Sequence, residues 1–83
     1  MKKNNLKVIP EFENYLVDKD ARIYANTKTN KKLEIESYYN DTYATFCVSL
    51  IDNKGIRYSI PIMDLYTLAF INHNYKVRKE LDF

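Results

Sequence analysis

The fold is decided by residues 43–70, which read YATFCVSLIDNKGIRYSIPIMDLYTLAF. Two stretches rich in β-branched and aromatic residues flank the polar turn 52–55. This order predicts a β-hairpin in which Gly55, at the end of the turn, adopts a positive φ. Pro61 follows directly and predicts a helix over 62–71, because a missing N–H is tolerated in the first helical turn.

The buried faces of these elements are predicted from the alternation of side chains. In the first strand one face is uniformly apolar and is expected in the core: Ala44, Phe46, Val48 and Leu50. The opposite face comprises Tyr43, Thr45, Cys47, Ser49 and Ile51. The helix has only two polar residues, Asp64 and Thr67. Such a helix is buried on several sides or covers a partner.

The rest of the chain adds short strands. They are expected at 8–10, 15–17, 22–25 and 32–36, with Leu33 and Ile35 facing the core. Residues 37–42 are expected to turn, and residues 75–83 to form a terminal strand or a short helix. Residues 1–7 are expected to be a flexible N-terminal arm, and residues 8–83 a single domain. The predicted fold is α+β, a small antiparallel sheet of three to five strands with one helix packed across it.

Composition narrows the class of protein. A single cysteine among 83 residues allows no intramolecular disulfide, which is typical of a reducing compartment such as the cytoplasm. No apolar run approaches the ~18 residues of a membrane span, and no segment of signal-peptide length follows the basic N-terminus. We therefore expect a cytoplasmic protein without membrane contact, located in the host cell cytoplasm if a phage encodes it.

Residues that could carry catalysis are few and scattered. His73 is the only histidine, and Cys47 has no second thiol. A zinc site needs about four nitrogen or sulfur ligands, and one glycine cannot build a phosphate-binding loop. Acids two residues apart, such as Glu34 and Glu36, are typical of a solvated strand face. The sequence therefore predicts no catalytic residue, no metal and no cofactor, and a protein that is not an enzyme.

Positive charge falls in three short segments. They contain Lys2, Lys3 and Lys7; Lys28, Lys31 and Lys32; and Lys76, Arg78 and Lys79. The net charge is only +2, which is low for a nucleic-acid binder. The segments are therefore interpreted either as solubilising surface or as phosphate contacts.

Tyrosine is the one enriched residue type, with eight copies. Tyr38, Tyr39 and Tyr43 lie close together near one expected sheet edge. Aromatic side chains favour strands, so half-buried packing in the sheet accounts for them. They also suit a protein interface or stacking on bases, and the sequence leaves these interpretations open.

Residues 9–24, IPEFENYLVDKDARIY, resemble the opening of the nuclease-associated modular domain of phage and intron homing endonucleases of the His-Asn-His class. That opening has an Ile-Pro pair, an aromatic residue, a Tyr-x-Val core and then Gly-Arg-Val/Ile-Tyr. The turn Asn53-Lys54-Gly55 and the segment 65–72, LYTLAFIN, resemble the Asn-Gly-type turn and the Leu-Val-x-x-Ala-Phe-Ile segment of that family. The resemblance covers residues 8–72 and extends to the order of the motifs.

The chain departs from this family pattern at several positions. The family usually has Gly at the position of Ala21, and its His-Arg pair before the helix aligns with Met63 and Asp64. Its catalytic His-Asn-His segment should follow Asn72, where His73 is the only histidine. The resemblance therefore implies a relative without the nuclease segment, in which the front portion contacts DNA and no catalytic residue is carried over.

Two functions are left open. The first is a small phage-type DNA-binding protein whose phosphate contacts are Lys28, Lys31, Lys32, Arg57, Lys76, Arg78 and Lys79. The second is a phage-encoded, anti-CRISPR-like inhibitor that binds a host or CRISPR enzyme, with a homodimer also possible. Its interface residues are Tyr38, Tyr39, Tyr43, Met63, Tyr66 and Phe70. The resemblance favours DNA, whereas the nearly neutral outward face of the sheet and the apolar helix favour a protein partner.

Overall fold

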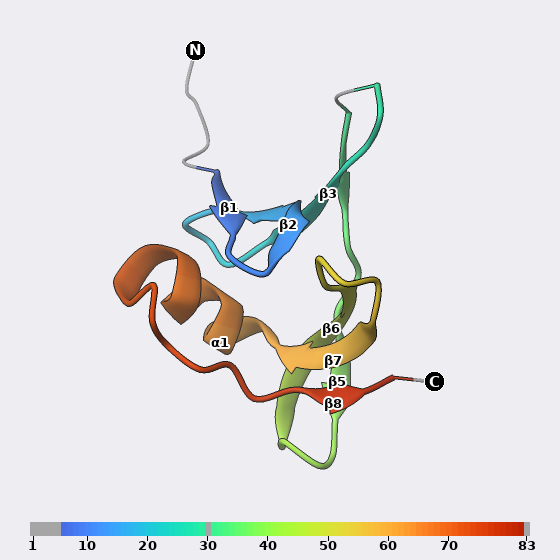
Figure 1. Ribbon diagram of the computed structural model, residues 1–83. Coiled ribbons are helices and arrows are strands. Elements are labelled where there is room, and N and C mark those ends of the chain that lie inside the picture. Colours follow the sequence, from blue (N-terminus) through green and yellow to red (C-terminus); the bar gives the residue numbers. More distant parts are fainter. Residues whose placement is uncertain (1–5, 30, 83) are drawn as a thin grey trace.

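The computed structural model describes residues 6–29 and 31–82, which form two antiparallel sheets of four strands each and one helix (Figure 1). The first sheet contains, in spatial order, β1 (Lys7–Ile9), β2 (Phe12–Val17), β3 (Ile23–Asn26) and β4 (Lys32–Glu34). The second contains β5 (Tyr38–Asn40), β6 (Thr45–Ile51), β7 (Arg57–Pro61) and β8 (Glu80–Leu81). The helix comprises α1 (Ile62–Tyr66) and a π-helical continuation, η1 (Thr67–Ile71). The predicted α+β class is confirmed, with the strands divided between two sheets.

The β6–β7 hairpin closes as its sequence predicts. Oδ1 of Asp52 accepts hydrogen bonds from the backbone N–H groups of Lys54 and Ile56, both at 2.9 Å. Gly55 has a φ of 87°, in the left-handed region that glycine adopts without steric strain. The N–H of Ile56 stabilises the charged carboxylate and so lowers the pKa of Asp52. One side chain therefore organises the whole turn.

The hydrophobic core lies between the helix and the two sheets. Its buried members from the second sheet and the helix are Val48, Leu50, Ile60, Leu65, Leu68 and Ala69. Those from the first sheet are Ile9, Phe12, Val17 and Ile23. α1 contacts β6 and β7 of the second sheet, and η1 contacts β1 of the first sheet, so both sheets cover the apolar surface of the helix. The helix is therefore held mainly inside the molecule, which is one of the two outcomes that its composition allows.

One end of β6 contradicts the predicted face assignment. Ala44 lies in the turn before the strand with a φ of 56°, and Phe46 is 55% exposed, although both are predicted in the core. Cys47, predicted on the opposite face, is fully buried between its register partners Tyr38 and Pro61, and burial raises the pKa of its thiol. The prediction is wrong because it assumes one covered face along the whole strand. The helix packs only on the half of that face that holds Val48 and Leu50, and Cys47 is buried on the opposite face beside Tyr38 and Pro61.

Several element boundaries also differ from the prediction. Residues 37–42 are not one turn, because Tyr38–Asn40 form β5 and the turn follows at 41–44. Leu33, predicted in the core, is 58% exposed because β4 extends past the region that the second sheet and the helix cover. Pro61, expected in the first helical turn, instead completes β7 with a ψ of 134°, whereas the helix begins at Ile62 as predicted.

The N-terminal arm predicted over residues 1–7 overlaps the first strand. Lys7 belongs to β1, which is an edge strand as the Ile9-Pro10 sequence predicts. Residues 1–5, including Lys2 and Lys3, lie outside the described residues. The described domain therefore begins with the edge of the first sheet.

Residues 75–82 run along the helix and return beside β7 as β8 (Figure 1), so the terminal strand is the alternative that the structure contains. Asp64, which is 3% exposed, holds this segment to the helix. Its Oδ2 accepts hydrogen bonds from N and Nε of Arg78 at 2.8 and 3.1 Å, and its Oδ1 accepts one from Nη2 at 3.0 Å. Both carboxylate oxygens are thus satisfied, as a buried charge requires. The pairing with Asp64 raises the pKa of Arg78.

Candidate nucleic-acid interface

The β3–β4 hairpin projects from the rest of the molecule (Figure 1). Tyr24 on β3 and Glu34 on β4 are register partners at its base. At its tip, the backbone N–H of Thr27 donates to the carbonyl of Lys31 at 3.0 Å, and the Thr27 hydroxyl accepts from the N–H of Lys31 at 3.1 Å. No side chain in the described ranges 24–29 and 31–34 is buried. The hairpin is therefore shaped by its own hydrogen bonds and open to solvent.

Charge at the tip of this hairpin has one sign. Lys28, Lys31 and Lys32 are all exposed, and the first acidic residue after them is Glu34. Within the described part of the chain, no carboxylate forms an ion pair with these three lysines. The hydroxyl of Thr29 forms a hydrogen bond with the hydroxyl of Thr27 at 3.2 Å. The tip therefore presents three ammonium groups to solvent.

The base of the hairpin is built on Asp18, whose side chain is buried. Oδ1 of Asp18 accepts from the N–H groups of Asp20 and Arg22, both at 2.9 Å, and Oδ2 accepts from the Tyr24 hydroxyl at 3.2 Å. Desolvation on burial raises the pKa of Tyr24. These bonds fix the direction in which β3 leaves the turn. The sequence predicts the turn from its aspartates, but the burial of Asp18 depends on packing and carries no sequence signal of its own.

Two of the other predicted phosphate contacts are engaged within the protein. Arg78 pairs with buried Asp64, and its guanidinium carbon lies 5.5 Å from the ring centre of Tyr43. Nζ of Lys79 lies 4.4 Å from the ring centre of Tyr58. Both cations therefore hold the C-terminal segment against the body, at the opposite end of the molecule from the hairpin tip (Figure 1).

The remaining two predicted phosphate contacts are separate from each other. Arg57 begins β7 and donates from its guanidinium to Oγ of Ser49 at 3.1 Å. Lys76 is exposed in the segment after the helix. The structure thus divides the seven predicted cations, and it brings together Lys28, Lys31 and Lys32 at the hairpin tip.

The residues predicted for a protein interface are also divided. On the helix, Tyr66 and Phe70 are half-buried and stack with ring centres 4.9 Å apart, and Met63 is exposed. Nζ of Lys7 lies 5.4 Å from the centre of the Phe70 ring. The aromatic pair on the helix is therefore partly covered by the body of the protein.

The tyrosines of the second sheet differ in exposure. Tyr38 and Tyr39 are exposed on β5, and the Tyr38 hydroxyl forms a hydrogen bond with Oγ of Ser59. Tyr43 is half-buried in the turn before β6, and burial raises the pKa of its hydroxyl. Tyr39 forms an edge-to-face pair with Phe46, a residue that the sequence places in the core. Phe46 is therefore an exposed aromatic that sequence reasoning missed.

The single histidine of the sequence, His73, is exposed just after the helix. Nε2 of His73 lies 3.2 Å from the carbonyl oxygen of Ala69, at the end of the helix. In residues 6–29 and 31–82, no three His, Cys, Asp or Glu side chains come together as a metal site requires. No helix in the same ranges is long and apolar enough to cross a membrane.

Comparison with known proteins identifies no relative of this chain. Neither protein-family models, nor curated proteins, nor solved structures match it. The resemblance of residues 8–72 to a homing-endonuclease module therefore remains a prediction from the sequence.

Proposed function

We propose that this protein is a non-catalytic, phage-type DNA-binding domain that contacts the duplex through the β3–β4 hairpin. The observation that carries the proposal is the exposed tip, which contains Lys28, Lys31 and Lys32 in a stretch without acidic residues between Asp20 and Glu34. Other predicted cations, such as Arg78, already have partners inside the protein. The resemblance to a DNA-contacting module favours DNA as the nucleic acid.

A two-stranded β-ribbon has a size that the major groove accepts, because that groove is about 12 Å wide in B-DNA. In this arrangement the three lysines contact phosphates on the groove walls. Such contacts position a protein on the duplex but do not read its sequence. We therefore propose binding with little sequence preference.

The electrostatic contribution has a measurable size. Neutralising three phosphates gives a log-log dependence of the association constant on salt with a slope of about −2.7. This term weakens binding sharply as salt rises, because each counterion released on complex formation gains less entropy when the solution already contains more salt. A domain with a net charge of +2 has little other long-range attraction for DNA.

Fluorescence anisotropy with a labelled 20-base-pair duplex, titrated from about 20 to 200 mM salt, tests this proposal. The variant combines Lys28→Gln, Lys31→Gln and Lys32→Gln and should lose most of the slope. A matched control combines Lys19→Gln, Lys54→Gln and Lys76→Gln, which removes the same charge from exposed positions outside the hairpin. The control should retain at least about two thirds of the slope if the hairpin supplies the contacts.

Two results would contradict the proposal. One is no binding of the duplex by the unaltered protein at the lowest salt. The other is an equal reduction of the salt slope in both triple variants, which would show that binding depends on the overall charge of the protein and not on the hairpin. Circular dichroism of each variant shows whether its fold is intact.

A further inference from the structure

Four strands form the outer edges of the two sheets, and β5 differs from the other three. Each of the other three edges has a charged side chain: Lys7 on β1, Lys32 and Glu34 on β4, and Glu80 on β8. By contrast, β5 is Tyr38-Tyr39-Asn40 and carries no charge. Charged side chains on an edge strand discourage pairing with another chain. The β5 edge is therefore the one that is chemically open to an added strand.

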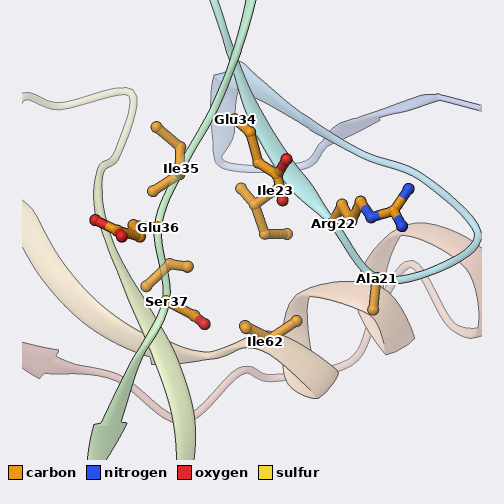
Figure 2. A pocket seen from close by; sticks show the side chains of 9 residues that line it. Ala21, Arg22, Ile23, Glu34, Ile35, Glu36, Ser37 and Ile62 are labelled. Carbon is orange, nitrogen blue, oxygen red and sulfur yellow. The ribbon is translucent and has the colours of Figure 1, made fainter.

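A hollow of about 580 Å³ lies beside the chain that leads into β5 (Figure 2). It opens where residues 34–37 separate from β3, below the hydrogen bond from the N–H of Ile35 to the carbonyl of Ile23. Its apolar lining comes from both sheets and the helix: Ile23, Ile35, Val48 and Ile62. The hollow thus combines an apolar wall with charged residues at the end of the open edge.

The same face continues to an exposed aromatic pair. Tyr39 and Phe46 are register partners, each 55% exposed, with ring centres 5.6 Å apart. Phe46 and Val48 are two residues apart on β6 and therefore share a face. Alternate side chains of an added strand are about 6.6 Å apart. One such side chain can enter the hollow while the next one packs on the aromatic pair.

The charge around this edge selects the partner. Glu34, Glu36 and Asp41 are exposed along the segment, and none forms an ion pair within the described residues. The lining of the hollow contains two acids and one cation, Arg22. Antiparallel pairing of β5 with a second copy would bring the acids that flank the strand, Glu36 and Asp41, near those of that copy, which is unfavourable. A basic strand meets opposite charge instead.

We propose that the β5 edge binds an extended segment of another protein in which apolar residues alternate with lysine or arginine. The segment adds to the second sheet beside β5, with its apolar side chains on the hollow and on the Tyr39–Phe46 pair. Backbone hydrogen bonds supply affinity in this mode, and the hollow supplies specificity. This surface is separate from the lysines at the hairpin tip, so the inference does not depend on DNA binding.

Three blocked seven-residue peptides test the inference on the full chain. They are Lys-Val-Lys-Val-Lys-Val-Lys, its counterpart with Glu in place of Lys, and a third peptide with Pro in place of the central Val. Titration of ¹⁵N-labelled protein by NMR should show the first peptide shifting the amide signals of residues 36–40. It should bind at least about tenfold more tightly than the others, because the second carries like charge and the third lacks a backbone donor.

A pair of variants locates the binding. Tyr39→Lys places a charge on the β5 edge and should weaken the first peptide at least about tenfold, as for a central interface residue. Leu81→Lys makes the same change at an equally exposed residue of β8 and should change binding less than about twofold. The hairpin variant lacking three lysines should bind the peptide as the unaltered protein does.

Three results would overturn the inference. The first is no binding of the first peptide at about 1 mM, a concentration that corresponds to only about 4 kcal/mol of binding free energy. The second is an equal loss of peptide affinity in Tyr39→Lys and Leu81→Lys. The third is a dimer of the unaltered protein that Tyr39→Lys dissociates. The last result, measured by light scattering, would assign the edge to a second copy of the chain.

Discussion

The hairpins β3–β4 and β6–β7 share a local design but differ in what packs against them. Each joins antiparallel strands through a polar turn in which one side chain, Thr27 or Asp52, bonds the backbone. The helix covers β6 and β7, where Leu50 is fully buried. The second sheet and the helix do not cover β4, where Leu33 is 58% exposed. Local chemistry therefore makes both hairpins, and packing makes one a core element and the other a projecting arm.

The largest expected effect tests this contrast directly. Leu50→Ala should destabilise the protein by about 2–5 kcal/mol, because it removes buried methyl groups and leaves a cavity. Leu33→Ala, the same change on the projecting hairpin, should change stability by less than about 0.5 kcal/mol. Urea unfolding followed by circular dichroism measures both. Similar losses in the two variants would show that β4 is packed in solution.

A smaller effect concerns the turn at the base of the projecting hairpin. Ala21 has a φ of 66°, a conformation that costs a residue with a Cβ roughly 1 kcal/mol relative to glycine. Ala21→Gly should therefore stabilise the protein by up to about 1 kcal/mol, less the added freedom of the unfolded chain. Ala69→Gly, in the buried helix, should destabilise it. Thermal unfolding should give changes in Tm of opposite sign for the two variants. A lower Tm in both would show that the backbone at Ala21 is not strained.

The smallest effect is a pH dependence in the turn of the core hairpin. The pKa of Asp52 is lowered in the folded state from its ordinary value of 3.8, chiefly by the N–H of Ile56. Its contribution to stability is therefore present above pH 3.8 and is lost as pH falls through the lower folded-state pKa. Asp52→Asn should flatten the decline of stability below pH 4. Urea unfolding midpoints of the unaltered protein and of Asp52→Asn between about pH 5 and 2.5 measure the difference. If the two midpoints fall in parallel as pH decreases, Asp52 does not contribute to the pH dependence of stability.

The accuracy of the sequence predictions follows the range of the interactions involved. The turn at Asp52 and Gly55 is predictable because residues four or fewer positions apart determine it. The short strand β5 is missed because its last residue, Asn40, also belongs to the turn signal Asn40-Asp41. The faces of Phe46 and Cys47 are assigned wrongly because alternation does not show which part of a strand is covered.

The candidate site shows the same division. The lysines at the hairpin tip are recognisable in the sequence because they lie within five positions of one another. Their separation from Arg78 is not recognisable, because it depends on the pairing of Arg78 with Asp64 from another element. The hollow beside β5 brings together Ile23, Ile35, Val48 and Ile62, which only folding makes neighbours.

By itself, the sequence determined the α+β class, the core hairpin, the limits of the helix and the basic stretch after β3, because propensity, turn chemistry and charge act over a few residues. Only the tertiary structure decided that the strands divide between two sheets and that the helix is shared by both. It also decided which hairpin remains outside the core and which sheet edge remains open. These outcomes depend on how a limited apolar surface is distributed among distant segments, and that distribution is a property of the whole packed chain.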